Sequence, residues 1–249
     1  MSDFDTSRWA DPAFSREYLD SADNYIPDRF YLFQVLRSFY RTFVARNGPV
    51  RVCDLGCGDG ILTDQLLRED PAMEVTVIDA SGDMLAAAQA RFKGRTNISF
   101  LQRDFEMLLR EDSTPGHFDL VMSSFAIHHV DRPQRQKLFA EVLRRLNPEG
   151  WFVNIETALP DHPAFTDWYY GLWQDWIVRR GRLLGHGDKH HGVPRQAREN
   201  PDNKYSPLTD QLADLKDAGF KAVDCHYKNG IFAIYAGQKP LPTTGGLHV

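Results

Sequence analysis

The chain has few cysteines: Cys53, Cys57 and Cys225 are the only three among its 249 residues. Three thiols provide no disulfide framework. Cys53 and Cys57 lie four residues apart with no matching second pair, which argues against a zinc knuckle. We therefore expect reduced thiols in a cytoplasmic protein.

The sequence also lacks long apolar runs, internal repeats and a strong net charge. No apolar stretch approaches the ~20 residues of a membrane-spanning helix, and the opening MSDFDTSRWA has no apolar core of the kind found in a secretion signal. A net charge of -5 argues against wholesale binding to nucleic acid. A content of 42% hydrophobic and 25% charged residues is typical of globular proteins, so we expect a globular protein. We expect neither a membrane nor a nucleic acid as its partner.

Short β-branched runs alternate with helical stretches through most of the chain. The predicted strands cover residues 51–55, 74–78, 98–102, 118–123, 150–156, 220–227 and 230–235. The predicted helices among them cover residues 60–68, 84–92, 133–146 and 208–218. This rhythm predicts right-handed βαβ crossovers, and hence an α/β fold with a seven-stranded, mostly parallel sheet that carries helices on both faces.

Two segments depart from the rhythm and predict a cover over the sheet. Residues 12–46 are rich in aromatic side chains, with apolar positions at helical spacing from Pro27 to about Val44. Residues 157–206 combine an aromatic helix with a loop rich in Gly, His and basic residues, and they show no obvious strand. We assign 1–46 to an N-terminal helical cover, 47–156 with 207–239 to the α/β domain, 157–206 to a helical lid insertion, and 240–249 to a flexible tail.

The stretch VCDLGCGDG, which runs from Val52 to Gly60, predicts a ligand site after the first strand. Glycines there let backbone amides approach a ligand closely and permit a positive φ in the turn. A dinucleotide-binding loop would need a third small residue at position 61, where this chain has Ile61, and would set Asp54 beside a pyrophosphate without a compensating lysine. An acidic, glycine-rich turn better suits a ligand with a cationic end.

The string from Asp54 to Gly60 resembles motif I of the class I S-adenosylmethionine-dependent methyltransferases, whose cofactor carries positive amino and sulfonium groups. Further motifs in the same order extend the resemblance over residues 50–156 and the closing strands. It implies a Rossmann-like domain that binds S-adenosylmethionine. The cofactor-binding residues on this prediction are Arg29, Asp54, Gly56, Cys57, Gly58, Asp79, Ala80, Met84, Asp104, Phe105 and Ser124.

The resemblance also assigns roles to several of these residues. Asp79 follows Gly56 by 23 residues, close to the ~20 expected of a carboxylate that receives the two ribose hydroxyls, although an Asp at a strand end is usually a helix cap. Asp104 would accept the adenine amino group, while Phe105 and Met84 would pack on the ring.

Two consecutive histidines follow the fourth predicted strand, in a region that resembles the family's motif IV. A histidine suits proton removal because its pKa of ~6.5 lies near the working pH. We predict His129, and next His128, as the catalytic base of a direct in-line methyl transfer to a small molecule. Alternatively, one of them caps the following turn or packs beneath the lid, and a thiolate or halide acceptor would need no base.

The predicted cover supplies the residues that we expect to meet the methyl acceptor. The aromatic candidates are Tyr25, Trp168 and Trp173, and the cationic candidates are Arg195 and Arg198. Residues 179–204 carry seven Lys and Arg against three Asp and Glu, a surplus that suits an anionic ligand. The alternative is that the aromatics pack the lid onto the body and the basic loop is simply solvated.

Other functions stay open on the sequence alone. The segment from Asp23 to Arg29 distantly resembles the carboxy-S-adenosylmethionine synthases, but Gly58 replaces their serine, which favours ordinary methyl transfer. A tRNA-modifying enzyme and a non-catalytic scaffold are the remaining alternatives, and a homodimer is left open. His186 and His190 are four residues apart in a glycine-rich segment, so we predict no metal site.

Overall fold

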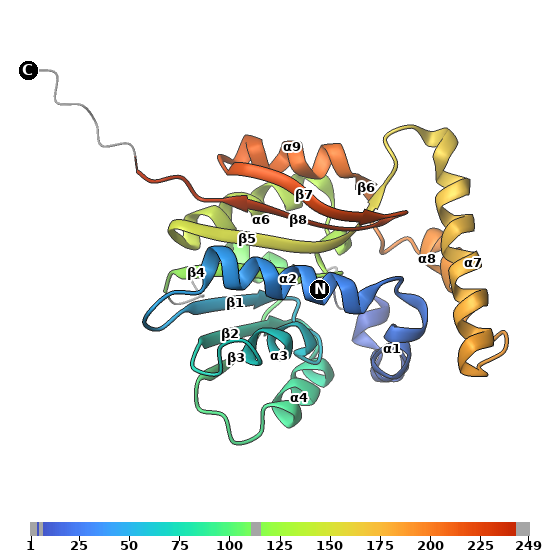
Figure 1. Ribbon diagram of the computed structural model, residues 1–249, viewed down its shortest axis with the longest axis horizontal. Coiled ribbons are helices and arrows are strands. Elements are labelled where there is room, and N and C mark those ends of the chain that lie inside the picture. The colour runs from blue at the N-terminus through green and yellow to red at the C-terminus, as the bar shows by residue number, and fades with distance from the viewer. Residues whose placement is uncertain (1–3, 5–6, 111–115, 243–249) are drawn as a thin grey trace, which may run out of the picture.

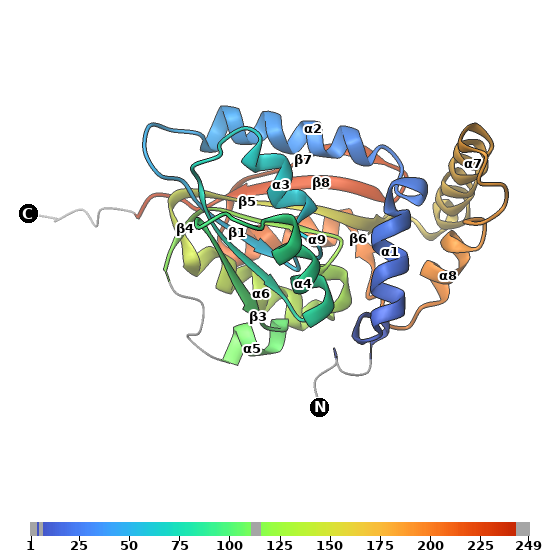
Figure 2. The ribbon, with the colours of Figure 1, turned by 90° about the horizontal axis from the view of Figure 1, so that it is seen from below.

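A computed structural model describes residue 4, residues 7–110 and residues 116–242. Its centre is one twisted sheet with helices on both faces (Figures 1 and 2). The strands are β1 (Arg51–Leu55), β2 (Glu74–Asp79), β3 (Ile98–Gln102), β4 (Phe118–Ser124), β5 (Leu146–Leu159), β6 (Ser206–Pro207), β7 (Lys221–Asn229) and β8 (Phe232–Gln238).

The strand order is β3-β2-β1-β4-β5-β8-β7, with the short β6 paired to β5 off this path. The first five strands are parallel, whereas β8 runs antiparallel to both β5 and β7. The predicted α/β fold with a mostly parallel sheet is confirmed. Because the chain order reverses between β1 and β4, the carboxyl ends of these two strands border a crevice of the kind in which open α/β sheets bind ligands.

The helices divide between the two faces of the sheet. Those in the described ranges are α1 (Pro12–Tyr25), α2 (Arg29–Phe39), α3 (Ile61–Leu67), α4 (Gly82–Arg91), α5 (Phe105–Arg110), α6 (Arg132–Arg145), α7 (Thr166–Leu184), α8 (Val193–Glu199) and α9 (Leu208–Ala218), with short turns η2 (Arg8–Ala10), η3 (Tyr40–Val44), η4 (Ile127–His129) and η5 (Pro163–Phe165). Apolar residues of α2, α3 and α4 pack on one face, and those of α5, α6 and α9 pack on the other.

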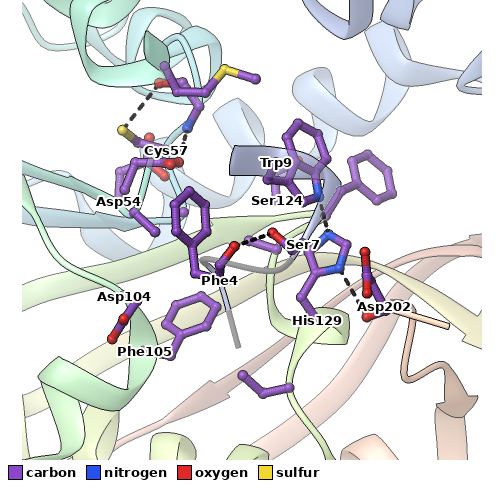
Figure 3. A pocket seen from close by; sticks show the side chains of 18 of the residues that line it. Phe4, Ser7, Trp9, Asp54, Cys57, Asp104, Phe105, Ser124, His129 and Asp202 are labelled. Carbon is purple, nitrogen blue, oxygen red and sulfur yellow. Dashed lines mark hydrogen bonds between the residues drawn. The ribbon is translucent and has the colours of Figure 1, made fainter. Parts of the chain in front are cut away.

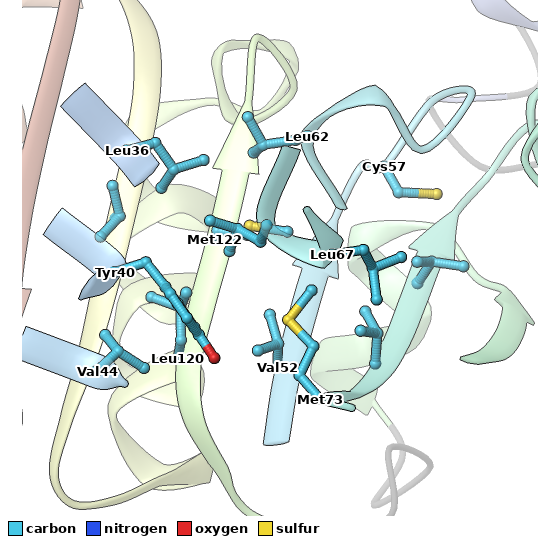
Figure 4. Packing of buried hydrophobic residues seen from close by; sticks show 14 of the residues in the cluster. Leu36, Tyr40, Val44, Val52, Cys57, Leu62, Leu67, Met73, Leu120 and Met122 are labelled. Carbon is cyan, nitrogen blue, oxygen red and sulfur yellow. The ribbon is translucent and has the colours of Figure 1, made fainter. Parts of the chain in front are cut away.

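Successive side chains along each strand point to opposite faces of the sheet, and this alternation separates the two cores. Val52 of β1 and Met122 of β4 belong to the core under α2 and α3, whereas Cys53 and Val121, one position away, belong to the core under α6. Figure 4 shows Val52 and Met122 beneath Leu36 of α2. A strand buried on both faces has few places for polar groups except at its ends, where the site is found.

Three departures from the predicted elements lie in the cover segments. The N-terminal region contains α1 in addition to the predicted helix, and Asp11 caps α1 by accepting the Ala13 N–H at 2.9 Å. In residues 157–206, where no strand was expected, β5 continues to Leu159 and β6 pairs with its end. The loop expected after the aromatic helix also contains α8.

The two cover segments meet at one end of the sheet, where α1, α7 and α8 lie together (Figures 1 and 2). A third apolar core joins Ala22 of α1, Trp173 of α7 and Phe232 of β8. The assignment of these segments as a mobile cover stays a prediction. Within the described part of the chain, no helix is long and apolar enough to cross a membrane. Most of the predicted tail, residues 243–249, lies outside the described residues.

Candidate active site

A pocket of about 400 Å³ lies at the carboxyl ends of β1, β2 and β4 (Figure 3). All eleven residues that the sequence predicted for the cofactor line it. They lie at the ends of β1, β2 and β4, on the loops after β1, β2 and β3, at the start of α2, and on α4 and α5. The predicted residues in the lining are Arg29, Asp54, Gly56, Cys57, Gly58, Asp79, Ala80, Met84, Asp104, Phe105 and Ser124.

The glycine-rich turn after β1 forms one wall of the pocket. Gly56 has a φ of +66°, and a Cβ built on it would lie 2.3 Å from the Cβ of Ala126. Gly58 has a φ of +55°. Side chains would therefore be strained at both positions, and at Gly56 would also collide with the loop after β4.

Asp54, the penultimate residue of β1, is a buried carboxyl group with one oxygen that has no hydrogen-bond partner. Its Oδ2 accepts a hydrogen bond from the Thr63 hydroxyl at 2.7 Å, while its buried Oδ1 has no hydrogen-bond partner. Burial raises the pKa of Asp54 to about 7, and the neighbouring Asp79 adds to the rise. An unpartnered carboxyl oxygen in a pocket wall fits a ligand that brings a cationic donor.

Asp79 ends β2 and organises the turns on both sides of it. Its Oδ2 accepts the Gly58 N–H at 2.8 Å and its Oδ1 accepts the Ser81 N–H at 2.9 Å. Burial raises the pKa of this carboxyl group against the lowering effect of those backbone donors. Because each carboxylate oxygen can accept two hydrogen bonds, both keep capacity for a ligand hydroxyl.

Asp104 and Phe105 line the pocket after β3. The Asp104 Oδ1 accepts the Met107 N–H at 2.7 Å and thereby caps α5. Met84, which also lines the pocket, is buried at the start of α4, whose cap is Ser81. The lining therefore offers an aromatic ring and a thioether beside the carboxylates, groups that can pack on a flat heteroaromatic ring.

An N-terminal strap, which we define as residue 4 and residues 7–10, lines the pocket with Trp9 beside His129 and with Phe4 between Asp54 and Phe105 (Figure 3). Phe4, Ser7 and Trp9 of the strap line the pocket, together with Pro201, Asp202 and Lys204 of a loop after α8. The sequence analysis missed both segments, because the residues that they contact are far away along the chain and neither segment carries a motif.

His129 is fixed between these two segments. The Trp9 indole N–H donates to its Nε2 at 2.8 Å, and its Nδ1 lies 3.3 Å from the Asp202 carbonyl oxygen. An indole nitrogen only donates and a carbonyl oxygen only accepts, so His129 carries its proton on Nδ1 and offers a lone pair at Nε2. Burial, reinforced by His128, holds the pKa of His129 well below its usual range.

His128 is buried behind His129 and does not line the pocket. Its Nδ1 donates to Glu156 Oε1 at 2.5 Å, and the same carboxyl group accepts the backbone N–H of His128 and of Thr157. The rings of His128 and His129 are 4.1 Å apart between centroids. The structure thus separates the two predicted bases: His129 faces the pocket, and His128 is held behind it by Glu156.

The five residues predicted to bind the acceptor lie outside the pocket lining. The Trp173 indole N–H donates to the Tyr25 carbonyl oxygen at 2.6 Å, in the apolar core between α1 and α7. Trp168 is 59% exposed on α7, and the Arg198 guanidinium pairs with Asp167 at 2.7 Å. Arg195 lies on α8 together with Arg198. Helical aromatic spacing and basic charge place these residues on the cover but do not bring them to the pocket.

No group of three or more His, Cys, Asp or Glu side chains within the described ranges is arranged to hold a metal ion. His186 and His190 approach each other only as an edge-to-face ring pair with centroids 6.1 Å apart.

Comparison with known proteins identifies the domain that carries this pocket. Residues 52–150 match the model of a methyltransferase domain. A malonyl-(acyl-carrier protein) O-methyltransferase of Halalkalibacterium halodurans is 28% identical over 117 residues, which cover 47% of this chain and 42% of that protein. A demethylmenaquinone methyltransferase of Staphylococcus carnosus is 27% identical over 198 residues, 79% of this chain and 78% of that protein. The match with the malonyl relative thus spans less than half of its length.

A solved structure has a fold similar to that of this chain. An O-methyltransferase family protein from Burkholderia thailandensis superposes with a TM-score of 0.67 at 17% identity, over 95% of this chain and 63% of that chain. The matched methyltransferase domain contains the glycine-rich turn, Asp79 and His129 of the pocket, and His128 behind it. On these grounds, residues 52–150 carry a methyltransferase domain, and the chain is similar to the class I S-adenosylmethionine-dependent methyltransferases.

Proposed function

We propose that this protein transfers a methyl group from S-adenosylmethionine directly to a small molecule. The observation that carries the proposal is the joint lining of one pocket by Asp54, with its unpartnered oxygen, and by His129, with its Nε2 lone pair. The pocket therefore offers a carboxyl oxygen for a cationic ligand and a neutral imidazole for a proton.

The residues at the carboxyl edge fit the cofactor by their chemistry. Asp54 would hold its cationic amino acid end, Asp79 its ribose hydroxyls and Asp104 its adenine amino group, with Met84 and Phe105 packed on the adenine. When bound, S-adenosylmethionine supplies a methyl group on a positively charged sulfur. The glycine turn, for its part, keeps side chains out of the space beside Asp54.

His129 would accept the proton that an acceptor hydroxyl or amine loses on methylation. Its depressed pKa keeps the ring neutral at physiological pH, and Asp202 holds the proton on Nδ1 so that Nε2 is the basic atom. His128 and Glu156 would support the ring from behind as positioning residues.

A small-molecule acceptor agrees with the names of the relatives, which include a demethylmenaquinone methyltransferase with 79% of this chain matched. Nothing comparable favours the synthase alternative, because Arg195 and Arg198, its nearest candidates for an extra carboxylate, lie away from the pocket.

Calorimetry with S-adenosylmethionine, S-adenosylhomocysteine and NAD tests the cofactor assignment. We expect one site for each sulfur compound and none for NAD. An acceptor screen by mass spectrometry, which looks for a gain of one methyl group, then tests the activity. Binding of NAD without either sulfur compound would overturn the proposal.

A further inference from the structure

The strap closes a pocket that is small for two ligands. Its volume of about 400 Å³ lies near the lower end of the ~300–1,000 Å³ typical of sites for one small molecule. Methyl transfer needs two molecules side by side. The strap side chains fill part of this space: Trp9 lies beside His129, and Phe4 lies between Asp54 and Phe105 (Figure 3). With the cofactor at the carboxylate end, the space beside His129 that Trp9 now fills is the place for an acceptor.

The strap also occupies the atom on which the proposed chemistry depends. The single lone pair of neutral His129, at Nε2, receives the Trp9 indole N–H. The other ring nitrogen, Nδ1, is held by the backbone carbonyl oxygen of Asp202. The side-chain carboxylate of Asp202 in turn accepts the Arg8 backbone N–H at 3.3 Å. His129 cannot accept a proton from an acceptor while Trp9 remains in this position.

We propose that Trp9 is a built-in surrogate for the methyl acceptor, and that the acceptor is a flat, uncharged ring compound whose hydroxyl group replaces the indole N–H on Nε2 of His129. This inference rests on the proposed methyl transfer and adds the class of substrate. Trp9 is a flat apolar ring with one hydrogen-bond donor at its edge, and a phenol-type compound has the same three properties.

The surroundings of the indole favour an uncharged acceptor. Val130 and Pro201, which neighbour His129 and Asp202 in the chain, supply apolar surface to the lining. Two charged side chains of the lining have partners within the chain: the Lys204 Nζ donates to the Pro201 carbonyl oxygen at 2.5 Å, and the Asp202 carboxylate accepts the Arg8 backbone N–H. The cation-rich surface around Arg195 and Arg198, which would suit an anion, lies elsewhere.

The chemical step balances with these groups. The hydroxyl proton passes to Nε2 of His129, the hydroxyl oxygen forms its bond to the methyl carbon, and the bond between that carbon and the cofactor sulfur breaks. The sulfur keeps the electron pair and becomes a neutral thioether, while His129 becomes positively charged and later loses its proton to water.

The test uses the full chain saturated with S-adenosylhomocysteine, so that ligands bind without turnover. Three probes of similar shape are compared by calorimetry: 1-naphthol, 1-naphthoate and 1-methylnaphthalene. We expect naphthol to bind best. Trp9→Phe keeps a ring but removes the competing N–H, and it should tighten naphthol binding by about 2- to 12-fold, the factor that one ordinary hydrogen bond represents. S-adenosylhomocysteine binding should not change.

Trp176→Phe is the matched control, because Trp176 lies on α7 outside the pocket and the same substitution there should not change naphthol binding. Hydrogen exchange gives a second readout: naphthol should lower the protection of amides 7–10, since it displaces the strap. His129→Asn, which removes the bond to Trp9, should lower that protection without any ligand.

Two results would overturn the inference. The first is preferred binding of naphthoate, which would make the acceptor anionic. The second is weaker naphthol binding to Trp9→Phe together with a more protected strap, which would make Trp9 a wall that closes on the acceptor. A failure of S-adenosylhomocysteine to bind the wild-type protein would instead overturn the proposed function, so the two failures are distinguishable.

Discussion

At the scale of single residues, the pocket depends on carboxyl groups that serve both the fold and a ligand. Asp79 shows this double use, since Gly58 and Ser81 donate to it and a ribose would need its remaining acceptor sites. We expect Asp79→Ala to weaken S-adenosylhomocysteine binding by about 1.5–3 kcal/mol, the usual range for hydrogen bonds to a charged group. Calorimetry measures this, and Asp83→Ala, an exposed carboxylate in the first turn of α4, is the control.

The Asp79 result needs a measure of folding beside it, because the variant also loses two backbone contacts. If thermal melting is nearly unchanged, the lost affinity belongs to the ligand contact. Unchanged affinity in a folded Asp79→Ala protein would show that the ribose is held by other residues.

Asp54 predicts a pH dependence of cofactor binding. Burial raises its pKa to about 7, so part of the population is protonated at neutral pH, whereas a cationic ligand favours the ionised form. Affinity for S-adenosylmethionine should therefore rise with pH between about 6 and 7 and level off above, with proton release detectable by calorimetry in buffers of different ionisation enthalpy. Asp54→Asn should bind more weakly and without this slope; a retained slope would assign the titration to another group.

The same raised pKa determines whether the stability of the ligand-free protein rises or falls with pH. A carboxyl group whose folded pKa exceeds its unfolded value contributes stability at low pH, and this contribution is lost as the pH rises toward about 7. Ligand binding and folding thus respond to this one group in opposite directions.

At the scale of elements, the strands were predictable and the connections between distant segments were not. Alternating apolar residues such as Val52 and Cys53 point into two cores, so β1 and β3 have the predicted bounds. The cofactor end of the pocket was predictable because most of its residues lie at the carboxyl end of a strand or directly after one. Trp9 and Asp202 had no such signal, since they reach His129 across 120 and 73 residues of sequence.

Two helices are coupled by a buried ion pair that the sequence did not reveal. Asp214 of α9 is 1% exposed and accepts from Arg135 and Arg132 of α6. We expect Asp214→Ala to lower the free energy of unfolding by about 3–5 kcal/mol, because it leaves the buried Arg135 without its charge partner. Urea unfolding measures the loss.

The surface pair of Arg68 with Asp64 is the comparison for this prediction, since both side chains are partly exposed. Asp64→Asn should cost about 0.5 kcal/mol or less. Similar losses for the two variants would mean that the α6–α9 pair is solvated and that apolar packing alone joins the helices.

At the scale of the whole molecule, the question is whether the cover and the sheet unfold as one unit. Trp173 of α7 lies where the cover meets the sheet: its ring packs edge-to-face on Phe232 of β8, with centroids 5.1 Å apart, and its N–H bonds to the Tyr25 carbonyl oxygen. Truncating a buried aromatic residue costs about 3–5 kcal/mol.

If the cover opens independently, Trp173→Ala should raise amide exchange in α1 and α7 but leave β1 and β4 protected, because their cores lie under other helices. Trp173→Phe, which keeps a ring but loses the N–H, should raise amide exchange in α1 and α7 by a smaller amount. An equal loss of protection in the central strands would instead show one cooperative unit, and the strap would then have to move as a local segment while α1 and α7 stay in place.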